Sequence, residues 1–276
     1  MQTLGFLGAG NMAGAIIQGL LNNGFDASKL TICDMNADKL VSFAQQGCNI
    51  TPNASDLFNC EAVLLAVKPQ VLKDIISPLA ETAQQHKPLI LSVVAAIDAR
   101  SIEHWLGGDL AVIRTMPNTP ALVMAGATGL YANTNASTKH KQFAESIFES
   151  IGQYAWVDDE ALLHSVTAAA GSAPAYFFRF AEAMIKTATL QGLTKAQART
   201  LIGQTMLGAA KMINETQTSV DQMRINVCSP NGTTERAINS FDADNIDQVV
   251  ENAMKACFDR SIELSELLGE ASLKDK

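Results

Sequence analysis

The stretch Thr3-Leu-Gly-Phe-Leu-Gly-Ala-Gly-Asn-Met-Ala-Gly14 decides the fold of this chain. It begins with an apolar run of strand length, and a GxGxx(G/A) pattern follows directly. Gly8 permits a tight turn, Gly10 lets the backbone approach a diphosphate, and Ala13 lets the next helix pack against the strand. Because the N-terminus of that helix offers free N–H groups and partial positive charge, we predict a dinucleotide-binding turn here.

Outward from this turn, short apolar runs alternate with helical stretches as far as residue 157. The runs lie at residues 3–7, 30–33, 62–67, 89–94 and 111–114. Their continuous apolarity is typical of strands covered on both faces, as in a parallel sheet with crossover helices such as 13–22 and 71–84. We therefore predict an α/β domain over residues 1–158, with a doubly wound sheet of the Rossmann type.

After residue 158 the strand-like runs stop, and the chain is rich in Ala, Met and Leu. Thr194 and Ser219 each precede a glutamine by three residues, which predicts two helices that begin with a capping box. A last long helix has apolar residues at helical spacing, which predicts one buried face. That stripe comprises Ile246, Val249, Val250, Ala253, Cys257, Leu264 and Leu268. Residues 159–276 should therefore form an all-helical domain.

The segment 175–190 carries more aromatic side chains than a small helical domain can cover. Tyr176, Phe177, Phe178 and Phe180 lie around more than one face of the expected helix. We predict that a second copy of the chain covers the remainder, which makes the protein a homodimer, with a higher oligomer of dimers as a further option. The alternative is a central helix wrapped by its own neighbours.

Composition excludes several classes of protein. The net charge of −8 provides no basic surface for nucleic acid, and no apolar run approaches the ~20 residues of a membrane span. The chain start lacks the pattern of a signal peptide. Five widely spaced cysteines without a CxxC motif indicate reduced thiols and a cytoplasmic protein. Four scattered histidines give no reason to expect a metal site.

Polar residues follow the predicted strands where doubly wound sheets bind ligands. Asp34 ends the second strand, where an acidic residue accepts the ribose hydroxyls of NAD and repels a 2′-phosphate; alternatively, it only ends the strand or caps the next helix. Lys39 lies further into that helix. Lys68 and Arg114 follow later strands, as cofactor contacts or as solvated charges. Asn118 lies in a loop bracketed by two prolines, which suits a ligand-holding segment.

The segment Ser229-Pro-Asn-Gly-Thr-Thr-Glu-Arg-Ala237 interrupts a helical region. Pro230 fixes one backbone angle, Asn231 and Gly232 permit a left-handed turn, and a helix should begin at Thr233. Such a turn aims unpaired N–H groups outward and predicts a site for a carboxylate without a basic side chain. The alternative is a helix cap that binds no ligand.

Five motifs together resemble the pyrroline-5-carboxylate reductase family over nearly the whole chain. They are Gly-Ala-Gly-Asn-Met at 8–12, Ala-Val-Lys-Pro at 66–69, Met-Pro-Asn-Thr-Pro at 116–120, Gly-Ser-Ala-Pro-Ala-Tyr at 171–176 and Ser-Pro-Asn-Gly-Thr-Thr at 229–234. The resemblance implies a Rossmann-type domain, a helical domain that interlocks with a second subunit, and reduction of 1-pyrroline-5-carboxylate to L-proline by NADPH or NADH.

The resemblance also implies roles for individual residues. The backbone of Gly232 and Thr233 would hold the substrate carboxylate, the Thr234 hydroxyl would face the ring nitrogen and act as the catalytic group, and Glu160 would lie near the substrate. Beside Asp34 and Asn118, the cofactor would be lined by Leu7, Gly8, Ala9, Gly10, Asn11, Met12, Asn36, Asn53, Ala66, Val67, Lys68, Pro69, Val94, Ala95 and Ala96.

Two other functions remain open at the level of sequence. A β-hydroxyacid dehydrogenase also joins a GxGxx(G/A) domain to long helices, and it needs a proton-transferring lysine, for which Lys186 and Lys211 are available. A non-catalytic dinucleotide-sensing protein is the other alternative.

Overall fold

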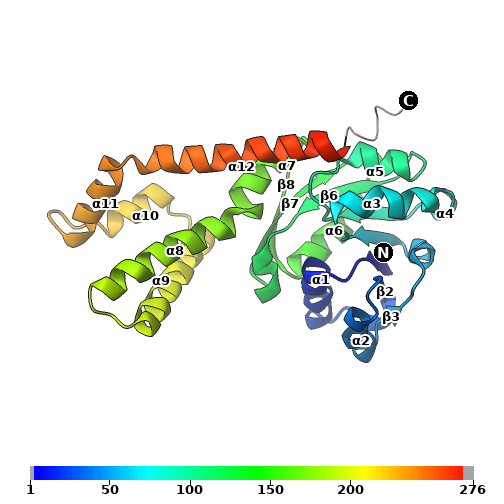
Figure 1. Cartoon of the computed structure of the whole chain (residues 1–276), viewed down its shortest axis with the longest axis horizontal. Helices are drawn as coiled ribbons and strands as arrows, with labels where there is room; N and C mark the ends of the chain where they lie inside the picture. Colours follow the sequence, from blue (N-terminus) through cyan, green and yellow to red (C-terminus); the bar gives the residue numbers. More distant parts are fainter. Residues whose placement is uncertain (1–2, 270–276) are drawn as a thin grey trace. The chain divides into compact units, whose positions relative to one another are not determined.

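The computed structural model describes residues 3–269, and these divide into two compact units. The first unit comprises residues 3–174 and 257–269, and the second comprises residues 175–256. Figure 1 follows the elements along the chain from blue to red.

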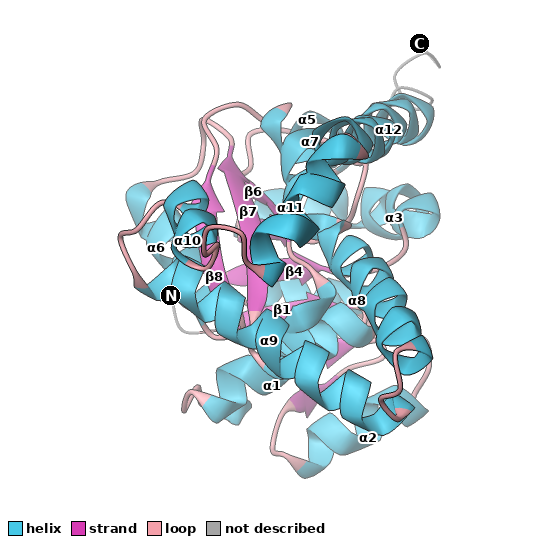
Figure 2. Ribbon diagram, turned by 90° about the vertical axis from the view of Figure 1, so that its left-hand side faces the viewer, coloured by secondary structure: helices cyan, strands magenta, loops and turns pink. Residues whose placement is uncertain are grey.

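The first unit is built around a sheet in which the described strands have the order β3-β2-β1-β4-β5-β6-β7-β8. The strands, magenta in Figure 2, are β1 (Leu4–Leu7), β2 (Leu30–Cys33), β3 (Asn49–Ile50), β4 (Ala62–Leu65), β5 (Leu89–Ser92), β6 (Val112–Met116), β7 (Gly126–Ala132) and β8 (Gly152–Trp156). The order from β3 to β6 is that of a Rossmann fold. The predicted doubly wound domain is therefore confirmed, and each of the five predicted runs forms a strand.

Strand β7 departs from the expected parallel sheet, because it pairs with β6 in the antiparallel direction. Residues 117–125, which include the 3₁₀ turn η4 (Thr119–Val123), connect the two strands. A parallel connection needs a crossover of about a dozen or more residues, whereas an antiparallel pair accepts a short one. Helix α6 (Thr138–Glu149) then provides the crossover that lets β8 pair parallel to β7.

Most helices of the first unit connect strands, and the last ones follow β8. They are α1 (Asn11–Asn22), α2 (Asp38–Gln45), α3 (Pro69–Ile76), α4 (Ala80–His86), α5 (Ala99–Trp105), α6 and α7 (Leu162–Val166), with short turns η1 (Ala27–Lys29), η2 (Ala54–Asn59), η3 (Ser77–Leu79) and the π-helical η5 (Thr167–Gly171). The single helix expected over 71–84 is wrong, because η3 separates α3 from α4. Pro78 explains the break, since it has no N–H to continue the helix.

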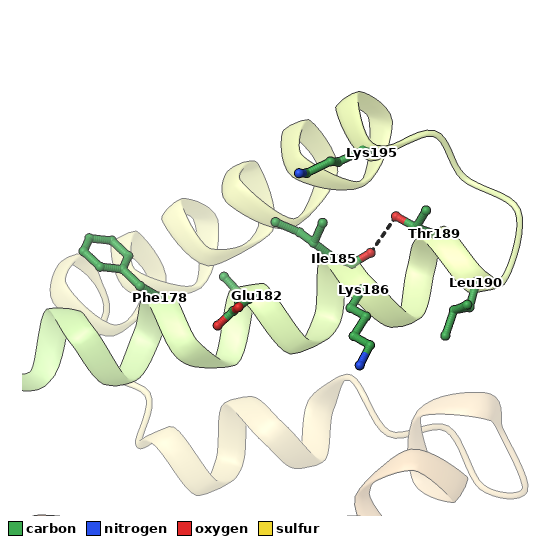
Figure 3. A pocket seen from close by; sticks show the side chains of 8 residues that line it. Phe178, Glu182, Ile185, Lys186, Thr189, Leu190 and Lys195 are labelled. Carbon is green, nitrogen blue, oxygen red and sulfur yellow. Dashed lines mark hydrogen bonds between the residues drawn. The ribbon is translucent and has the colours of Figure 1, made fainter.

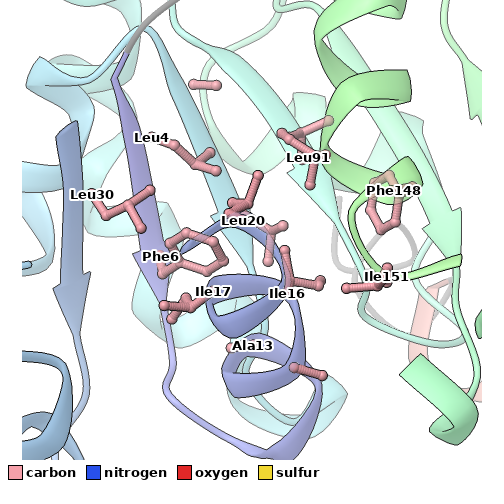
Figure 4. Close-up of a cluster of buried hydrophobic side chains, with 14 of the residues drawn as sticks. Leu4, Phe6, Ala13, Ile16, Ile17, Leu20, Leu30, Leu91, Phe148 and Ile151 are labelled. Atoms are coloured by element: carbon pink, nitrogen blue, oxygen red, sulfur yellow. The ribbon is translucent and has the colours of Figure 1, made fainter. Parts of the chain in front are cut away.

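Two apolar clusters lie on opposite faces of the sheet. Leu64 packs in the first cluster, whereas its neighbours Val63 and Leu65 pack in the second, as the alternation of side chains along a strand requires. In Figure 4, Ile16 and Ile17 of α1 lie against Phe6 of β1 in the first cluster. Burial on both faces explains why these strands read as continuous apolar runs.

The second unit is helical throughout its described residues. It contains α8 (Ala173–Leu190) from residue 175, α9 (Lys195–Glu215), α10 (Val220–Asn226), α11 (Thr233–Ala243) and α12 (Ile246–Gly269) up to residue 256. The capping box predicted at Thr194 is confirmed, since Thr194 and Gln197 exchange both hydrogen bonds. The one predicted at Ser219 is wrong: α10 begins there, but no described residue makes a cap hydrogen bond to the Ser219 side chain. Gln222 instead donates to Asn226.

The buried face predicted for the last helix is wrong within a single chain. Val249 and Val250 are 58% and 48% exposed, while Cys257, Leu264 and Leu268 are partly buried. Among the described residues of the second unit, Ala198 and Ile202 are the only buried hydrophobic ones. The second unit therefore has almost no core of its own for the stripe to face.

The strand-like runs were predicted to stop after residue 158. The structure agrees, because β8 ends at Trp156 and only helices follow in the described chain. The domain boundary between 158 and 159 stays a prediction, and the compact units divide at 174 and 256. No helix among the described residues has the length and apolarity to cross a membrane.

Candidate functional site

The dinucleotide turn lies between β1 and α1. Gly8 has a φ of +101°, and a Cβ there would lie 2.6 Å from the carbonyl oxygen of Ala66. A Cβ at Gly10, the N-cap of α1, would meet no described atom within 4 Å, so the backbone is open on that side. The first-turn N–H groups of α1 lie next to this opening, which is the geometry that binds a diphosphate.

Two cavities flank the turn. The dinucleotide cavity, of about 370 Å³, is lined by Leu7, Gly8, Gly10, Cys33, Asp34, Met35, Lys39, Pro52, Ala54, Ala66, Val67, Lys68, Val71 and Ile75. The other, of about 390 Å³, borders α1 and includes Ala9, Gly10 and Asn11. Most of the cofactor residues expected at the first, second and fourth strands therefore come together around one opening.

Four further residues that were expected to contact the cofactor lie near the opening but do not line the dinucleotide cavity. Met12 packs against the first apolar cluster, and Pro69 is the first residue of α3. Asn36 accepts a hydrogen bond from the N–H of Asp38 at the start of α2. Asn53 lies between Pro52 and Ala54, which do line the cavity.

Asp34 points its carboxylate at the protein backbone. Its two oxygens accept hydrogen bonds from the N–H groups of Ala9 and Asn36, each at 2.8 Å, and the Lys39 ammonium lies 3.4 Å away. Burial raises the pKa of Asp34, but these three donors lower it, and the resulting pKa lies below the ordinary 3.8. The carboxylate is therefore ionised at neutral pH and ties the turn to the second strand.

A third opening, the strand-end cavity, lies where β5 and β6 end. It has about 350 Å³ and is lined by Ala95, Ala96, Met116, Pro117, Thr167, Gly171, Ser172, Cys257, Arg260, Ser261 and Leu264. Val94 is buried beside it. Ala96 has a φ of +66°, and the Ser265 hydroxyl donates to its carbonyl oxygen at 3.1 Å. One hydroxyl of α12 thus contacts this loop at Ala96, the residue of 94–96 with a left-handed φ.

Asn118 is buried and binds protein on both sides of its amide. Its Oδ1 accepts from the Ala127 N–H at 2.9 Å, and its Nδ2 donates to the Ala170 carbonyl oxygen at 3.1 Å. These contacts join the proline-bracketed loop to β7 and to the π-helical turn η5.

Arg114 is not a solvated strand-end charge. It is 5% exposed, and its guanidinium lies 2.8 Å from the carboxylate of Glu160. The same Glu160 oxygen accepts the N–H of Ala99 at 2.7 Å. Nearby, His164 contacts the Ser261 hydroxyl at 2.8 Å, and burial together with the Arg114 charge lowers the pKa of His164 below 6.5. Glu160 thus bridges β6 and α5 in the first unit.

The turn before α11 forms as predicted, with one correction. Helix α11 begins at Thr233, and Asn231 has the left-handed φ of 58°, whereas Gly232 is extended with a φ of −80°. Glycine is needed at 232 for space, because a Cβ there would lie 2.8 Å from the Ser229 carbonyl oxygen. Asn231 accordingly accounts for the turn by itself.

The donors of this turn are partly used by the protein. The Gly232 N–H donates to the Ser229 carbonyl oxygen at 2.9 Å, so the turn itself uses this donor. The expected contact of the Gly232 backbone with the substrate carboxylate stays a prediction. The Asn231 N–H donates to the Glu235 carboxylate at 2.8 Å. The N–H groups of Thr233 and Thr234 have no acceptor among the described residues and point out of the helix start.

A further groove of about 560 Å³ lies on the second unit, along α8 and the start of α9. Phe178, Ile185 and Leu190 give it an apolar character, and Glu182, Lys186 and Lys195 border it (Figure 3). None of the substrate or cofactor residues expected from sequence lines this groove.

Sequence reasoning missed the α12 side of the strand-end cavity. The sequence places Cys257 in a packing stripe and gives no signal for Arg260 or Ser261. The motifs that contain Met116, Pro117, Gly171 and Ser172 are the signals that point to this cavity. Among the described residues no cluster of His, Cys, Asp and Glu could hold a metal ion.

Two family models match the chain in separate segments. Residues 160–264 match the dimerisation domain of pyrroline-5-carboxylate reductase, and residues 3–96 match the model described as NADP oxidoreductase, coenzyme F420-dependent.

Relatives match the chain over almost its whole length. Pyrroline-5-carboxylate reductases of Haemophilus influenzae and Pseudomonas aeruginosa are 41% and 40% identical, over 96% and 97% of this chain and 98% of each relative. The solved structure of a pyrroline-5-carboxylate reductase from Coxiella burnetii superposes with a TM-score of 0.92 at 39% identity, covering 95% of this chain and 98% of that one. The Plasmodium falciparum structure, which has NADP bound, superposes with a TM-score of 0.84 at 25% identity and the same coverage.

Proposed function

The chain belongs to the pyrroline-5-carboxylate reductase family, and from that premise we propose which of its residues carry out the NAD(P)H-dependent reduction of 1-pyrroline-5-carboxylate to L-proline, the last step of proline biosynthesis. Family membership favours this activity over the β-hydroxyacid dehydrogenase and the dinucleotide sensor. The observation that carries the residue assignment is the pair of outward-pointing N–H groups at Thr233 and Thr234.

The residues of the dinucleotide turn fit NADP or NAD. The space above Gly10 and the first turn of α1 would receive the diphosphate, and the residues around the dinucleotide cavity would surround the adenosine half. The loop of Val94, Ala95 and Ala96 and the Asn118 loop would position the nicotinamide half near the strand-end cavity. The reduced nicotinamide, when bound, supplies the hydride.

The start of α11 would bind the substrate carboxylate. The N–H groups of Thr233 and Thr234 provide the donors, and the lack of a side chain at Gly232 lets the turn pass close to Ser229 just before them. The partial positive charge of a helix N-terminus favours an anion there without a lysine or arginine. A carboxylate held at this place has a fixed orientation, which is most of what the reaction asks of the protein.

Thr234 would act on the reacting end of the substrate. A hydroxyl both donates and accepts, so Thr234 can hydrogen-bond to the ring nitrogen, which stays protonated in a cationic imine. This hydrogen bond would stabilise the positive charge of the protonated imine as it changes during reduction of the imine carbon. The role of Glu160 would be more remote, because its carboxylate is engaged with Arg114 and Ala99; its second oxygen is the part left to face a ligand.

Replacing Thr234 by alanine tests this assignment. We expect kcat for pyrroline-5-carboxylate to fall by at least ~10-fold, because removing a single donor to a developing charge costs on the order of 10²-fold or more, while KM changes less. Thr234→Ser keeps the hydroxyl and should retain most of the rate. An unchanged kcat in Thr234→Ala would refute the assigned role of Thr234. A rise in KM alone would assign the side chain to substrate binding instead.

The second unit supports a homodimer, because its residues belong to the segment that matches the family's dimerisation domain and they expose a large apolar surface. An oligomer of dimers is the further step that we propose for the assembly. We also place the enzyme in the cytoplasm, which the five free cysteines support.

A further inference from the structure

The acid at the end of β2 does not have the environment of a ribose-binding residue. In Rossmann domains that bind NAD, this carboxylate accepts the ribose hydroxyls. In this chain one Asp34 oxygen accepts the Ala9 N–H and the other accepts the Asn36 N–H, and only 12% of the side chain is exposed. Asp34 therefore holds the dinucleotide turn and the start of α2, with little of its carboxylate left for a ligand.

Lys39 compensates the charge of Asp34 and remains accessible. Its ammonium lies 3.4 Å from one Asp34 oxygen, and 46% of the side chain is exposed. A lysine ammonium has three N–H donors, and Asp34 takes one of them. Because Lys39 lines the dinucleotide cavity, the remaining donors are available to a ligand there.

Among the residues that line the dinucleotide cavity, positive charges outnumber negative ones. The charged residues that line it are Asp34, Lys39 and Lys68, so the two ammonium groups outnumber the carboxylate. The thiol of Cys33, the other titratable group in the lining, has a pKa raised by burial and stays uncharged. Lys39 thus offsets the repulsion that the Asp34 carboxylate would exert on a 2′-phosphate.

We propose that Lys39 binds the 2′-phosphate of NADPH, and that this lysine makes the enzyme bind NADPH more tightly than NADH. The end of β2 is where the adenine ribose lies in Rossmann domains, and a lysine ammonium binds phosphate as a compact point charge. Asp34 acts as a positioning residue, since its carboxylate keeps the Lys39 ammonium at the rim of the cavity. The inference rests on the proposed function only in requiring a dinucleotide in this cavity.

Calorimetric titration of the full-length protein with two fragments tests the inference without turnover. Adenosine 2′,5′-bisphosphate carries the 2′-phosphate and 5′-AMP lacks it. We expect the wild-type protein to bind the bisphosphate at least ~10-fold more tightly than 5′-AMP, and Lys39→Gln to weaken the bisphosphate by ~10-fold or more, about the loss of one charged hydrogen bond. The affinity for 5′-AMP should change less than about twofold. Lys139→Gln, an exposed lysine of α6, is the matched control and should change neither affinity.

Three results would overturn the inference. In the first, wild-type protein binds the two fragments equally, or 5′-AMP more tightly, which would return Asp34 to the role of a ribose ligand. In the second, Lys39→Gln binds the bisphosphate as well as wild-type protein does, or Lys139→Gln loses as much affinity. In the third, neither fragment binds, which also removes the dinucleotide site. An assay of pyrroline-5-carboxylate reduction with NADH as donor distinguishes failure of this inference from failure of the proposed function. If the protein reduces the substrate, the proposed function stands, even where one of the first two results rejects the role of Lys39.

Discussion

Arg114 shows at the residue scale how a distant neighbour decides the role of a charge. The sequence places it at the end of a buried strand, where a ligand contact and a solvated charge are equally consistent with the pattern. In the fold it is buried against Glu160, which reaches β6 from the connection after β8. No spacing rule links residues that are 46 positions apart, so this pair could not be read from the sequence.

We expect Glu160→Gln to lower the free energy of unfolding of the first unit by about 2 kcal/mol, because the Arg114 charge stays buried without a compensating charge. Urea denaturation followed by tryptophan fluorescence measures this unit, since Trp105 and Trp156 both belong to it.

The exposed ion pair between Arg260 and Glu263 provides the control for this substitution. Their nitrogen and oxygen lie 2.7 Å apart, and the side chains are 59% and 58% exposed. Glu263→Gln should change the free energy of unfolding by less than ~0.5 kcal/mol, because solvent screens the pair. Equal losses of unfolding free energy in the two variants would mean that the burial of Arg114 does not add to the cost of losing its partner charge.

At the scale of single elements, local signals worked where the neighbouring side chains agreed with them. Thr194 and Ser219 have the same spacing to a glutamine, and both helices begin where that spacing predicts. Only Thr194 forms the capping box. The Ser219 hydroxyl instead hydrogen-bonds to Asp221, which lowers the pKa of that carboxyl. The sequence shows that the Asp221 carboxylate lies two residues after Ser219. It does not show that the Ser219 hydroxyl binds this carboxylate and makes no cap hydrogen bond to the backbone of the helix start.

Thr194→Ala should destabilise the start of α9 by about 1 kcal/mol, the usual cost of a lost N-cap, which corresponds to roughly fivefold faster hydrogen exchange in its first turns. Exchange measured by mass spectrometry on peptides covering residues 194–200 would report it. Ser219→Ala, at the helix start without a cap hydrogen bond, serves as the control and should accelerate exchange at α10 clearly less. A larger effect at Ser219 would contradict the capping geometry.

Strands β7 and β8 were harder to predict than the five central strands. The sequence of β7 (GATGLYA) contains two glycines, and β8 has no fully buried residue, so neither forms a continuous apolar run. The central strands are buried on both faces and are therefore visible as runs. The antiparallel direction of β7 depends on the short η4 connection, which has no periodic signal.

At the scale of the whole molecule, the helical unit is incomplete as a single chain. Phe177 and Phe178 of α8 are 60% and 68% exposed, and Val249 of α12 is 58% exposed. Apolar surface of this extent is typical of a protein interface. The aromatic excess on 175–190 therefore indicated the dimer correctly, whereas the one buried face predicted for the stripe on α12 is not formed within a single chain, where Val249 and Val250 are exposed.

Phe178→Glu should convert the dimer to a monomer at micromolar concentration, because a carboxylate would have to be buried without a partner in the interface. Sedimentation velocity measures the change. Val41→Glu is the matched control, since Val41 is a 52% exposed apolar residue of α2, outside the segment that matches the dimerisation domain. If Phe178→Glu sedimented like the wild-type protein, α8 would not belong to the interface.

The sequence by itself determined the features that depend on neighbours along the chain: the Rossmann strands, the dinucleotide turn, the helix starts at Thr194 and Thr233, and the motifs that identify the family. Only the tertiary structure decided which groups are already bound by the protein. It turned the Asp34 carboxylate toward Ala9, paired Arg114 with Glu160, and used the Gly232 N–H within its own turn. The physical reason is that a hydrogen bond or ion pair depends on distances of about 3 Å, which folding sets between residues far apart in sequence.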